Sequence, residues 1–142
     1  MNGKDPSPAP WHLVVWIDHA VAHLYASNRE KVEEIATIHA PDQGRGHVHH
    51  HAGTPGPGHV PPDSHFLTQV ANNASVAREI LIIGPSTTPH DLHSFMKEHA
   101  PGVAERVVGI EPMKRASERE IHEFSRRFFR HHDLMAKPGS ER

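Results

Sequence analysis

The chain has no cysteine, few aromatic residues and no long hydrophobic run. The lack of cysteine excludes disulfide bonds, thiolate zinc sites and cysteine nucleophiles, and it fits a reducing compartment. No apolar stretch approaches the length of a membrane span, and the first ten residues, MNGKDPSPAP, lack the apolar core of a signal peptide. The net charge is only -2 with neutral histidines, so the chain as a whole is no polycation. The composition of these 142 residues predicts one soluble, cytoplasmic domain with no membrane partner.

Histidine is the abundant residue type, with 16 copies. Residues 44–59, GRGHVHHHAGTPGPGH, combine histidine with closely spaced glycine and proline. Glycine and proline at that density exclude a packed helix and a central strand, so a long solvent-facing loop is predicted at residues 41–63. Long loops in compact domains are either functional or disordered, so the function is expected at this loop or at a surface that it reaches. The loop histidines are His47, His49, His50, His51 and His59.

The spacing of apolar residues predicts one α/β domain over residues 12–136. A disordered N-terminal lead at 1–11 and a disordered tail at 137–142 are expected to flank it. The domain is predicted to begin with three strands in an antiparallel meander, within residues 13–17, 20–25 and 31–39. The third of these strands is ambiguous, because its EEIA segment also suits a helix.

Helices and strands are predicted to alternate after the loop. Asp63 or Ser64 caps a helix whose apolar residues recur at helical spacing. Residues 80–83, ILII, form a continuous apolar run, which is typical of a strand buried on both faces. The next helix begins at Thr88, which precedes a proline, and Pro101-Gly102 stop it.

The last strand and helix complete an α/β order. A buried strand is predicted at 107–110, and Ser117 with Glu120 forms a capping box that opens the final helix. The predicted buried stripe of this helix is Ile121, Phe124 and Phe128. The order strand, strand, strand, helix, strand, helix, strand, helix predicts a mixed sheet covered by helices, with a right-handed crossover between the last two strands.

Several segments in this order resemble a known family. The segments are WIDHAVAHLY, AREILIIGP, ERVVGIEP and a final helix that begins SEREI. Over roughly residues 12–132 they resemble bacterial relatives of the archaeal and eukaryotic peptide-release factors, some of which are called translational machinery proteins. The similar part is the middle domain of the release factors and of Pelota. The resemblance implies a ribonuclease-H-like fold and a ribosome or ribosomal RNA partner.

The chain differs from release factors at one loop. In release factors, a loop between the third strand and the first helix carries Gly-Gly-Gln, which helps water attack the peptidyl-tRNA ester. The histidine-rich loop occupies that place here, Gly-Gly-Gln is absent, and Gln43-Gly44 has the wrong order. The resemblance therefore implies a ribosome- or RNA-associated accessory protein, of the kind found among hibernation factors, without hydrolytic release activity.

The histidine-rich loop admits three interpretations. In an extended segment His47, His49 and His51 lie on one face and could bind zinc, nickel or copper. A mobile polar loop that binds metal weakly and without specificity is the preferred reading of the pattern alone. The family resemblance supports RNA contact instead, with imidazoles stacking on bases and Arg45 supplying charge. No cofactor is required under any of these interpretations. The loop candidates for RNA or ribosome contact are Arg45, His47, His49, His50, His51 and His59.

The final helix carries a candidate basic patch. Arg126, Arg127 and Arg130 lie on its outer part and suit RNA phosphate. A solvated helix face is an equally good interpretation, because acidic residues interleave with the arginines. Those acidic residues are Glu118, Glu120, Glu123 and Asp133.

Other polar residues favour structural roles. Asp18 and Glu111 follow strands, where ribonuclease-H-like nucleases hold magnesium, but no third carboxylate joins them. Histidines in the predicted strands, namely His12, His23 and His39, are expected to be sheet-edge or surface residues and not ligands. No complete catalytic constellation is present, so the residues do not favour an enzyme, although the question stays open. A metal-binding protein is the first alternative and a hydrolase or nuclease the second, and the oligomeric state stays open.

Overall fold

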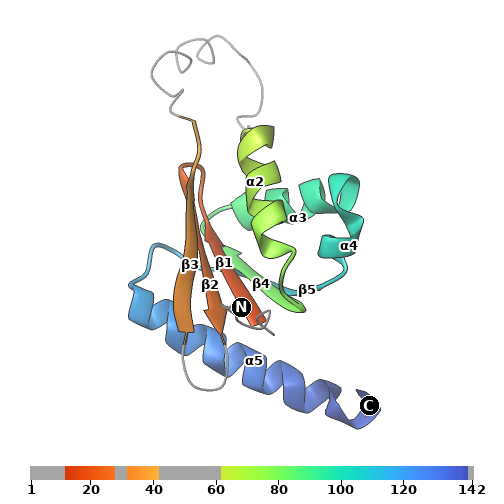
Figure 1. Cartoon of the computed structure of the whole chain (residues 1–142). Coiled ribbons are helices and arrows are strands. Elements are labelled where there is room, and N and C mark those ends of the chain that lie inside the picture. The colour runs from red at the N-terminus through yellow and green to blue at the C-terminus, as the bar shows by residue number, and fades with distance from the viewer. Residues whose placement is uncertain (1–11, 28–31, 42–61, 141–142) are drawn as a thin grey trace, which may run out of the picture.

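The computed structural model describes residues 12–27, 32–41 and 62–140. Five strands form one sheet in the order β3-β2-β1-β4-β5, and helices lie on both of its faces (Figure 1). The strands are β1 (His12–Ile17), β2 (Val21–Ser27), β3 (Val32–His39), β4 (Glu79–Gly84) and β5 (Val107–Pro112). The helices are α2 (Ser64–Ala74), α3 (Thr88–His99), α4 (Pro101–Ala104) and α5 (Glu118–Ser140).

The sheet is mixed. β1 pairs with β2, and β2 with β3, in the antiparallel sense. β1 also pairs with β4, and β4 with β5, in the parallel sense. The predicted α/β mixed sheet and the meander are therefore confirmed. The ambiguous EEIA segment is a strand, because β3 pairs with β2 from Val32 to His39.

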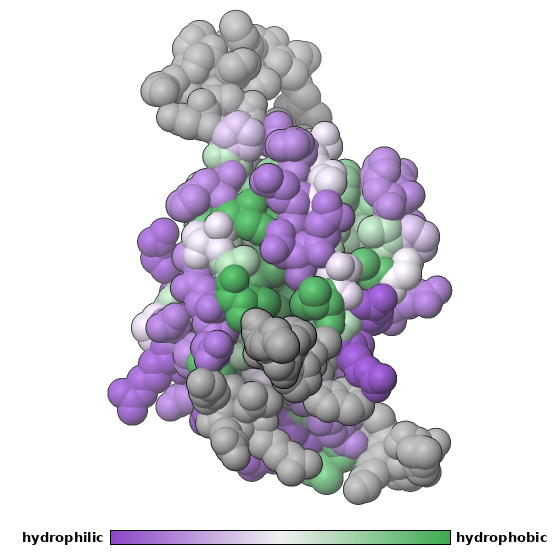
Figure 2. Space-filling model, viewed as in Figure 1, coloured by the Kyte–Doolittle hydropathy of each residue, from purple (hydrophilic) through white to green (hydrophobic). Residues whose placement is uncertain are grey.

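Side chains of β1 divide between two apolar clusters, since alternate residues of a strand point to opposite faces. Leu13, Val15 and Ile17 pack against α2, α3 and α4 on one face. Val14 and Trp16 pack against α5 on the other face. Figure 1 shows α2, α3 and α4 gathered on one side of the sheet and the long α5 crossing the other side. Hydrophilic residues cover most of the described surface seen in Figure 2.

Caps position the two helices that follow strand connections. The Asp63 carboxylate accepts hydrogen bonds from the backbone N–H groups of His65 and Phe66, at 2.8 and 3.0 Å, at the start of α2. At α5, the Ser117 hydroxyl accepts from the Glu120 N–H, and the Glu120 carboxylate accepts from the Ser117 N–H at 2.8 Å. Both predicted caps are confirmed, including the capping box.

α5 packs through a stripe that is shifted from the predicted one. Ile121, Ser125 and Phe129 are its buried residues, whereas Phe124 and Phe128 are half-buried. Phe128 packs closely over Gly109 of β5. A Cβ on Gly109 would lie 2.4 Å from the Phe128 ring.

Three further details differ from the sequence expectations. Pro101-Gly102 end α3, but Pro101 also starts the short helix α4, because proline suits a first helical turn. β5 is half-buried and not fully buried, because it lies at the edge of the sheet. α5 extends to Ser140, beyond the predicted domain end at 136, and residues 141–142 lie outside the described part.

The predicted N-terminal lead and most of the predicted loop cannot be compared with the fold. Residues 1–11 and 42–61 lie outside the described residues. No helix within residues 12–27, 32–41 and 62–140 is both long and apolar enough to span a membrane.

Candidate functional site

α5 presents a basic face to solvent. Arg126, Arg127 and Arg130 are all exposed. Arg126 and Arg130 are separated by one helical turn, so their side chains are neighbours on the helix surface. Three guanidinium groups in this arrangement can contact successive phosphates of a nucleic-acid backbone.

Three of the four acidic residues that interleave in sequence have other partners. Glu120 belongs to the capping box with Ser117. Glu123 forms an ion pair with Arg119, with 3.8 Å between the Oε2 and Nε atoms. Asp133 faces His12 instead. Among the described residues, no ion pair therefore involves the three exposed arginines.

The remaining predicted contact and metal residues cannot be placed. Arg45, His47, His49, His50, His51 and His59 lie outside the described residues. The possible zinc, nickel or copper site on His47, His49 and His51 therefore stays a prediction.

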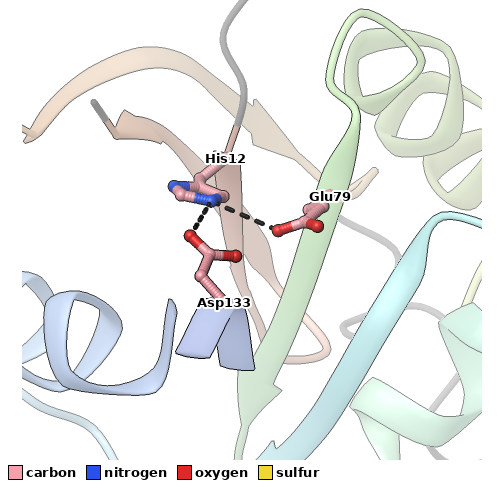
Figure 3. A group of neighbouring side chains, drawn as sticks. All are labelled: His12, Glu79 and Asp133. Atoms are coloured by element: carbon pink, nitrogen blue, oxygen red, sulfur yellow. Dashed lines mark ion pairs between the residues drawn. The ribbon is translucent and has the colours of Figure 1, made fainter. Parts of the chain in front are cut away.

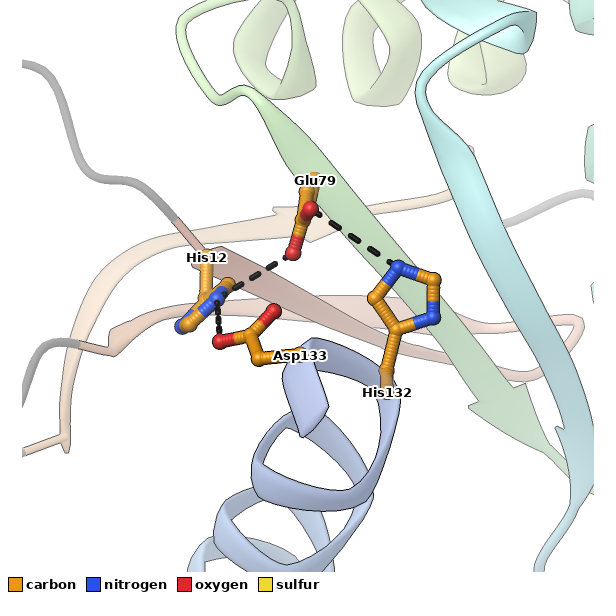
Figure 4. Close-up of polar contacts among 4 residues, drawn as sticks. All are labelled: His12, Glu79, His132 and Asp133. Carbon is orange, nitrogen blue, oxygen red and sulfur yellow. Dashed lines mark ion pairs between the residues drawn. The ribbon is translucent and has the colours of Figure 1, made fainter. Parts of the chain in front are cut away.

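The structure assembles a second polar group, at the margin between α5 and the sheet. Its members are His12, Glu79, His132 and Asp133. His12 Nε2 lies 3.2 Å from Glu79 Oε1 and 3.4 Å from Asp133 Oδ2 (Figure 3). His132 Nε2 lies 3.7 Å from the other carboxylate oxygen, Glu79 Oε2 (Figure 4). We call these four residues the histidine–carboxylate cluster.

Strand register and one aromatic contact bring the cluster together. His12 and Glu79 are the first residues of β1 and β4, and they are partners in the parallel ladder. The Phe129 ring stacks on the His12 ring, with centroids 4.0 Å apart and planes 14° apart. His132 and Asp133 follow Phe129 by three and four positions, so they lie on the same side of α5 as that buried ring. Packing of Phe129 therefore directs both side chains towards the ends of β1 and β4.

The cluster is electrostatically unbalanced. Burial raises the pKa of the Glu79 carboxyl, and the neighbouring Asp133 carboxylate raises it further, whereas His12 and His132 act in the opposite direction. Glu79 Oε1 is shielded from solvent and has no hydrogen-bond partner. Two carboxylates and two imidazoles thus converge, and one shielded carboxylate oxygen lacks the hydrogen bond that normally satisfies such a group.

Sequence reasoning missed this cluster. The four residues come from three separate segments, and their spacing contains no metal-ligand motif. His12 lies on the central strand β1 with 18% of its side chain exposed, so the sheet-edge expectation is wrong for it. The expectation of a surface or edge residue holds for His39, which is exposed on the edge strand β3. The one signal available in sequence was a charged residue at the start of the buried strand 79–84.

Asp18 has the structural role that the sequence favoured. Its Oδ1 atom accepts hydrogen bonds from the N–H groups of Ala20 and Val21, at 2.8 and 2.9 Å, within the β1–β2 turn. Asp18 and Glu111 join no group of three potential metal ligands within the described part of the chain. At the end of β4, Gly84 has φ +153°, and a Cβ there would lie 2.1 Å from the Ile17 carbonyl oxygen. The glycine is required by this close backbone approach.

Three solved structures share this fold. Archaeoglobus fulgidus Pelota is 18% identical with a TM-score of 0.59, and the match covers 83% of this chain and 31% of Pelota. Thermoplasma acidophilum Pelota is 17% identical with a TM-score of 0.57, over 85% of this chain and 33% of that protein. Saccharomyces cerevisiae Dom34, a translation termination-like factor, is 9% identical with a TM-score of 0.54, over 89% of this chain and 35% of Dom34.

These similarities are structural. No protein-family model matches the chain, and no curated protein matches it significantly in sequence. The chain spans about a third of the length of the three solved proteins. The predicted fold resemblance to Pelota is therefore confirmed, and at these identities it establishes the fold alone.

Proposed function

We propose that this protein is a translation-related accessory factor that binds the ribosome through ribosomal RNA. Its fold is similar to that of Pelota and Dom34, and Dom34 is a translation termination-like factor involved in RNA quality control. The proposed contact surface is the exposed face of α5 with Arg126, Arg127 and Arg130. Arg45 and the loop histidines supply additional contacts in this proposal.

The observation that carries the proposal is the unpaired state of these arginines. A solvated structural face would use interleaved carboxylates to balance its guanidinium groups. Here Glu120, Glu123 and Asp133 have other partners, and within the described residues the three arginines have no ion pair. An exposed row of uncompensated positive charge on a protein of net charge -2 supports local binding of phosphate.

The proposal does not include peptide release. The sequence lacks Gly-Gly-Gln, and the histidine-rich segment stands where the resemblance places that motif. We therefore propose a binder that occupies the ribosome, as hibernation factors do, and not a hydrolase.

Co-sedimentation of the full chain with ribosomes at increasing salt tests the proposal. The double variant Arg126→Gln/Arg130→Gln removes two positive charges from one side of α5. If both arginines contact phosphate, the binding constant falls and the slope of log K against log salt decreases by about 2. A matched control is Lys97→Glu, which also lowers the net charge by two. Lys97 is an exposed residue of α3, on the opposite face of the sheet from α5.

Equal weakening by the control and the double variant would show non-specific attraction and would overturn the assignment of α5. Absence of ribosome binding at every salt concentration would overturn the proposed function itself. A variant with His47, His49, His50 and His51 changed to alanine measures the loop contribution in the same assay.

A further inference from the structure

We propose that His12, Glu79 and Asp133 bind a divalent transition-metal ion of the Zn²⁺ class. Their donor atoms are one imidazole nitrogen and two carboxylate oxygens, and zinc accepts three such protein ligands with water in the fourth position. One potential ligand atom from each of His12, Glu79 and Asp133 lies within 4.8 Å of the others. This site is separate from the histidine-rich loop and is built entirely from described residues.

The distances fit ligands around an ion better than a hydrogen-bonded pair. With metal–donor bonds of 2.0–2.2 Å, donors at neighbouring corners of a zinc tetrahedron are about 3.3–3.6 Å apart. His12 Nε2 is 3.2 and 3.4 Å from its two carboxylate oxygens. Charge-assisted hydrogen bonds are shorter, at about 2.7–2.9 Å.

The same chain contains an ordinary histidine–carboxylate pair for comparison. On the surface of β2 and β3, His23 Nδ1 lies 2.8 Å from Glu34 Oε2 as a hydrogen bond. The cluster differs, because Glu79 Oε1 has no hydrogen-bond partner although it is nearest to His12. A carboxylate oxygen that is shielded from solvent and has no hydrogen-bond donor is a group that a cation can satisfy.

The surroundings of the three ligands leave the site accessible. His132 lies beside them, because its Nε2 atom is 3.7 Å from the other carboxylate oxygen of Glu79, Oε2 (Figure 4). Asp133 is 51% exposed, which leaves a path for metal entry. Magnesium is disfavoured, because it prefers octahedral oxygen ligands.

A bound ion would fasten α5 to the sheet. His12 and Glu79 belong to the central strands β1 and β4, whereas His132 and Asp133 belong to α5. The ion would offset the charge of two adjacent carboxylates and hold the helix turn that follows Arg130. The metal site would therefore adjoin the proposed RNA-binding face, but its existence does not depend on RNA binding.

Zinc titration of the metal-free full chain tests the proposal. The titrations use a background variant in which His47, His49, His50 and His51 are alanine, so that loop binding does not contribute. ZnCl2 is added during calorimetry, and thermal unfolding is followed with and without zinc. We expect one equivalent of zinc to bind and to raise the Tm, and MgCl2 to do neither.

Asp133→Asn in the same background is the decisive variant, and Glu123→Gln, on another exposed carboxylate of α5, is the control. Loss of a residue that only hydrogen-bonds to a metal ligand weakens metal sites by about 10–100-fold, so loss of a direct ligand is expected to weaken zinc binding by more than about 10-fold. The control should bind like the background protein. Equal zinc affinity in both variants would overturn the proposal.

Nuclear magnetic resonance keeps the test decisive if Asp133→Asn does not fold. Zinc should shift the ring nitrogen signals of His12 in the background protein. Zinc binding by the unaltered chain together with none by the background variant would assign the metal to the loop and would overturn the proposal. A zinc complex that leaves the His12 signals unchanged would overturn it as well.

Discussion

The two faces of the sheet are built on different principles. The face covered by α2, α3 and α4 is an apolar cluster of aliphatic side chains around Phe66. Among the described residues, the opposite face is covered by α5 alone, and its cluster contains Trp16, Tyr25 and Phe129. α5 brings polar side chains to the margin of its packed surface and an arginine row to its outer side.

The number of helices on each face decides where polar side chains can gather. Three helices share the burial of the first face, so its side chains need only be apolar and close-packed. A single helix on the second face leaves both of its flanks available for polar groups. The histidine–carboxylate cluster lies on one flank, and Arg126 and Arg130 lie on the exposed side. Both candidate sites therefore lie on the side of the sheet that a single helix covers.

The largest expected effect comes from deleting one aromatic ring on each face. Phe66→Ala should destabilise the protein by about 3–5 kcal/mol, because the ring is fully buried. Phe129→Ala should cost about 3 kcal/mol, since that ring is 3% exposed, and it also removes the stack on His12. Denaturant unfolding measures both. If Phe129→Ala lowers the free energy of unfolding by less than about 1 kcal/mol, α5 is not part of the core, and the comparison of the two faces fails.

Removing the helix caps gives a smaller, matched effect. Asp63→Ala at α2 and Ser117→Ala at α5 should each cost about 1 kcal/mol, because each leaves helix N–H groups without an acceptor. Denaturant unfolding again provides the measurement. Ribosome co-sedimentation should not change for Ser117→Ala, because Phe129 still holds the second half of α5. Loss of binding would show that the whole helix orients the arginines.

The pH dependence of stability sharpens the comparison at Glu79. Burial and Asp133 raise the pKa of this carboxyl in the folded protein, so the folded state holds the proton more tightly than the unfolded state. The resulting stability is present below the ordinary carboxyl pKa and is lost as pH rises through the raised pKa. In the absence of metal, Glu79→Gln should flatten this loss when unfolding is followed across that pH range. An unchanged profile would contradict the unbalanced charge of the cluster.

Glu34 should show the opposite sign and the smallest effect. Hydrogen bonds from Thr37 and then from His23 lower the pKa of this carboxyl. Its contribution is present above the ordinary carboxyl pKa and is lost as pH falls through the lowered pKa. Because the pair is on the surface, Glu34→Gln should cost less than about 1 kcal/mol at neutral pH. Unfolding of Glu79→Gln and Glu34→Gln across the same pH range measures the two effects. Changes of the same sign in both variants would contradict the prediction.

Local sequence features predicted most of the fold. The caps at Asp63 and Ser117 identified the starts of α2 and α5, and the ILII run identified β4. Such features act within a few residues, so they can be recognised in one dimension. The buried stripe of α5 was predicted less well. Its position depends on how α5 lies on the sheet, where Phe128 packs over Gly109 of another element.

The candidate sites divide in the same way. The arginines of α5 were recognisable in sequence, because residues three and four apart share a helix face. Whether carboxylates compensate their charge was not recognisable, because Glu123 pairs one turn away along the helix whereas Asp133 pairs with His12 at the start of β1. The histidine–carboxylate cluster could not be predicted, since it needs the parallel register of β1 and β4 together with the Phe129 contact.

The sequence by itself determined the α/β order, the helix starts and the lack of a Gly-Gly-Gln motif, because each depends on neighbouring residues in the chain. Only the tertiary structure decided which charges are paired and which converge. Ion pairs and metal-ligand geometry depend on distances of a few ångströms between segments far apart in sequence. Those distances are established when the sheet register and the packing of α5 are complete.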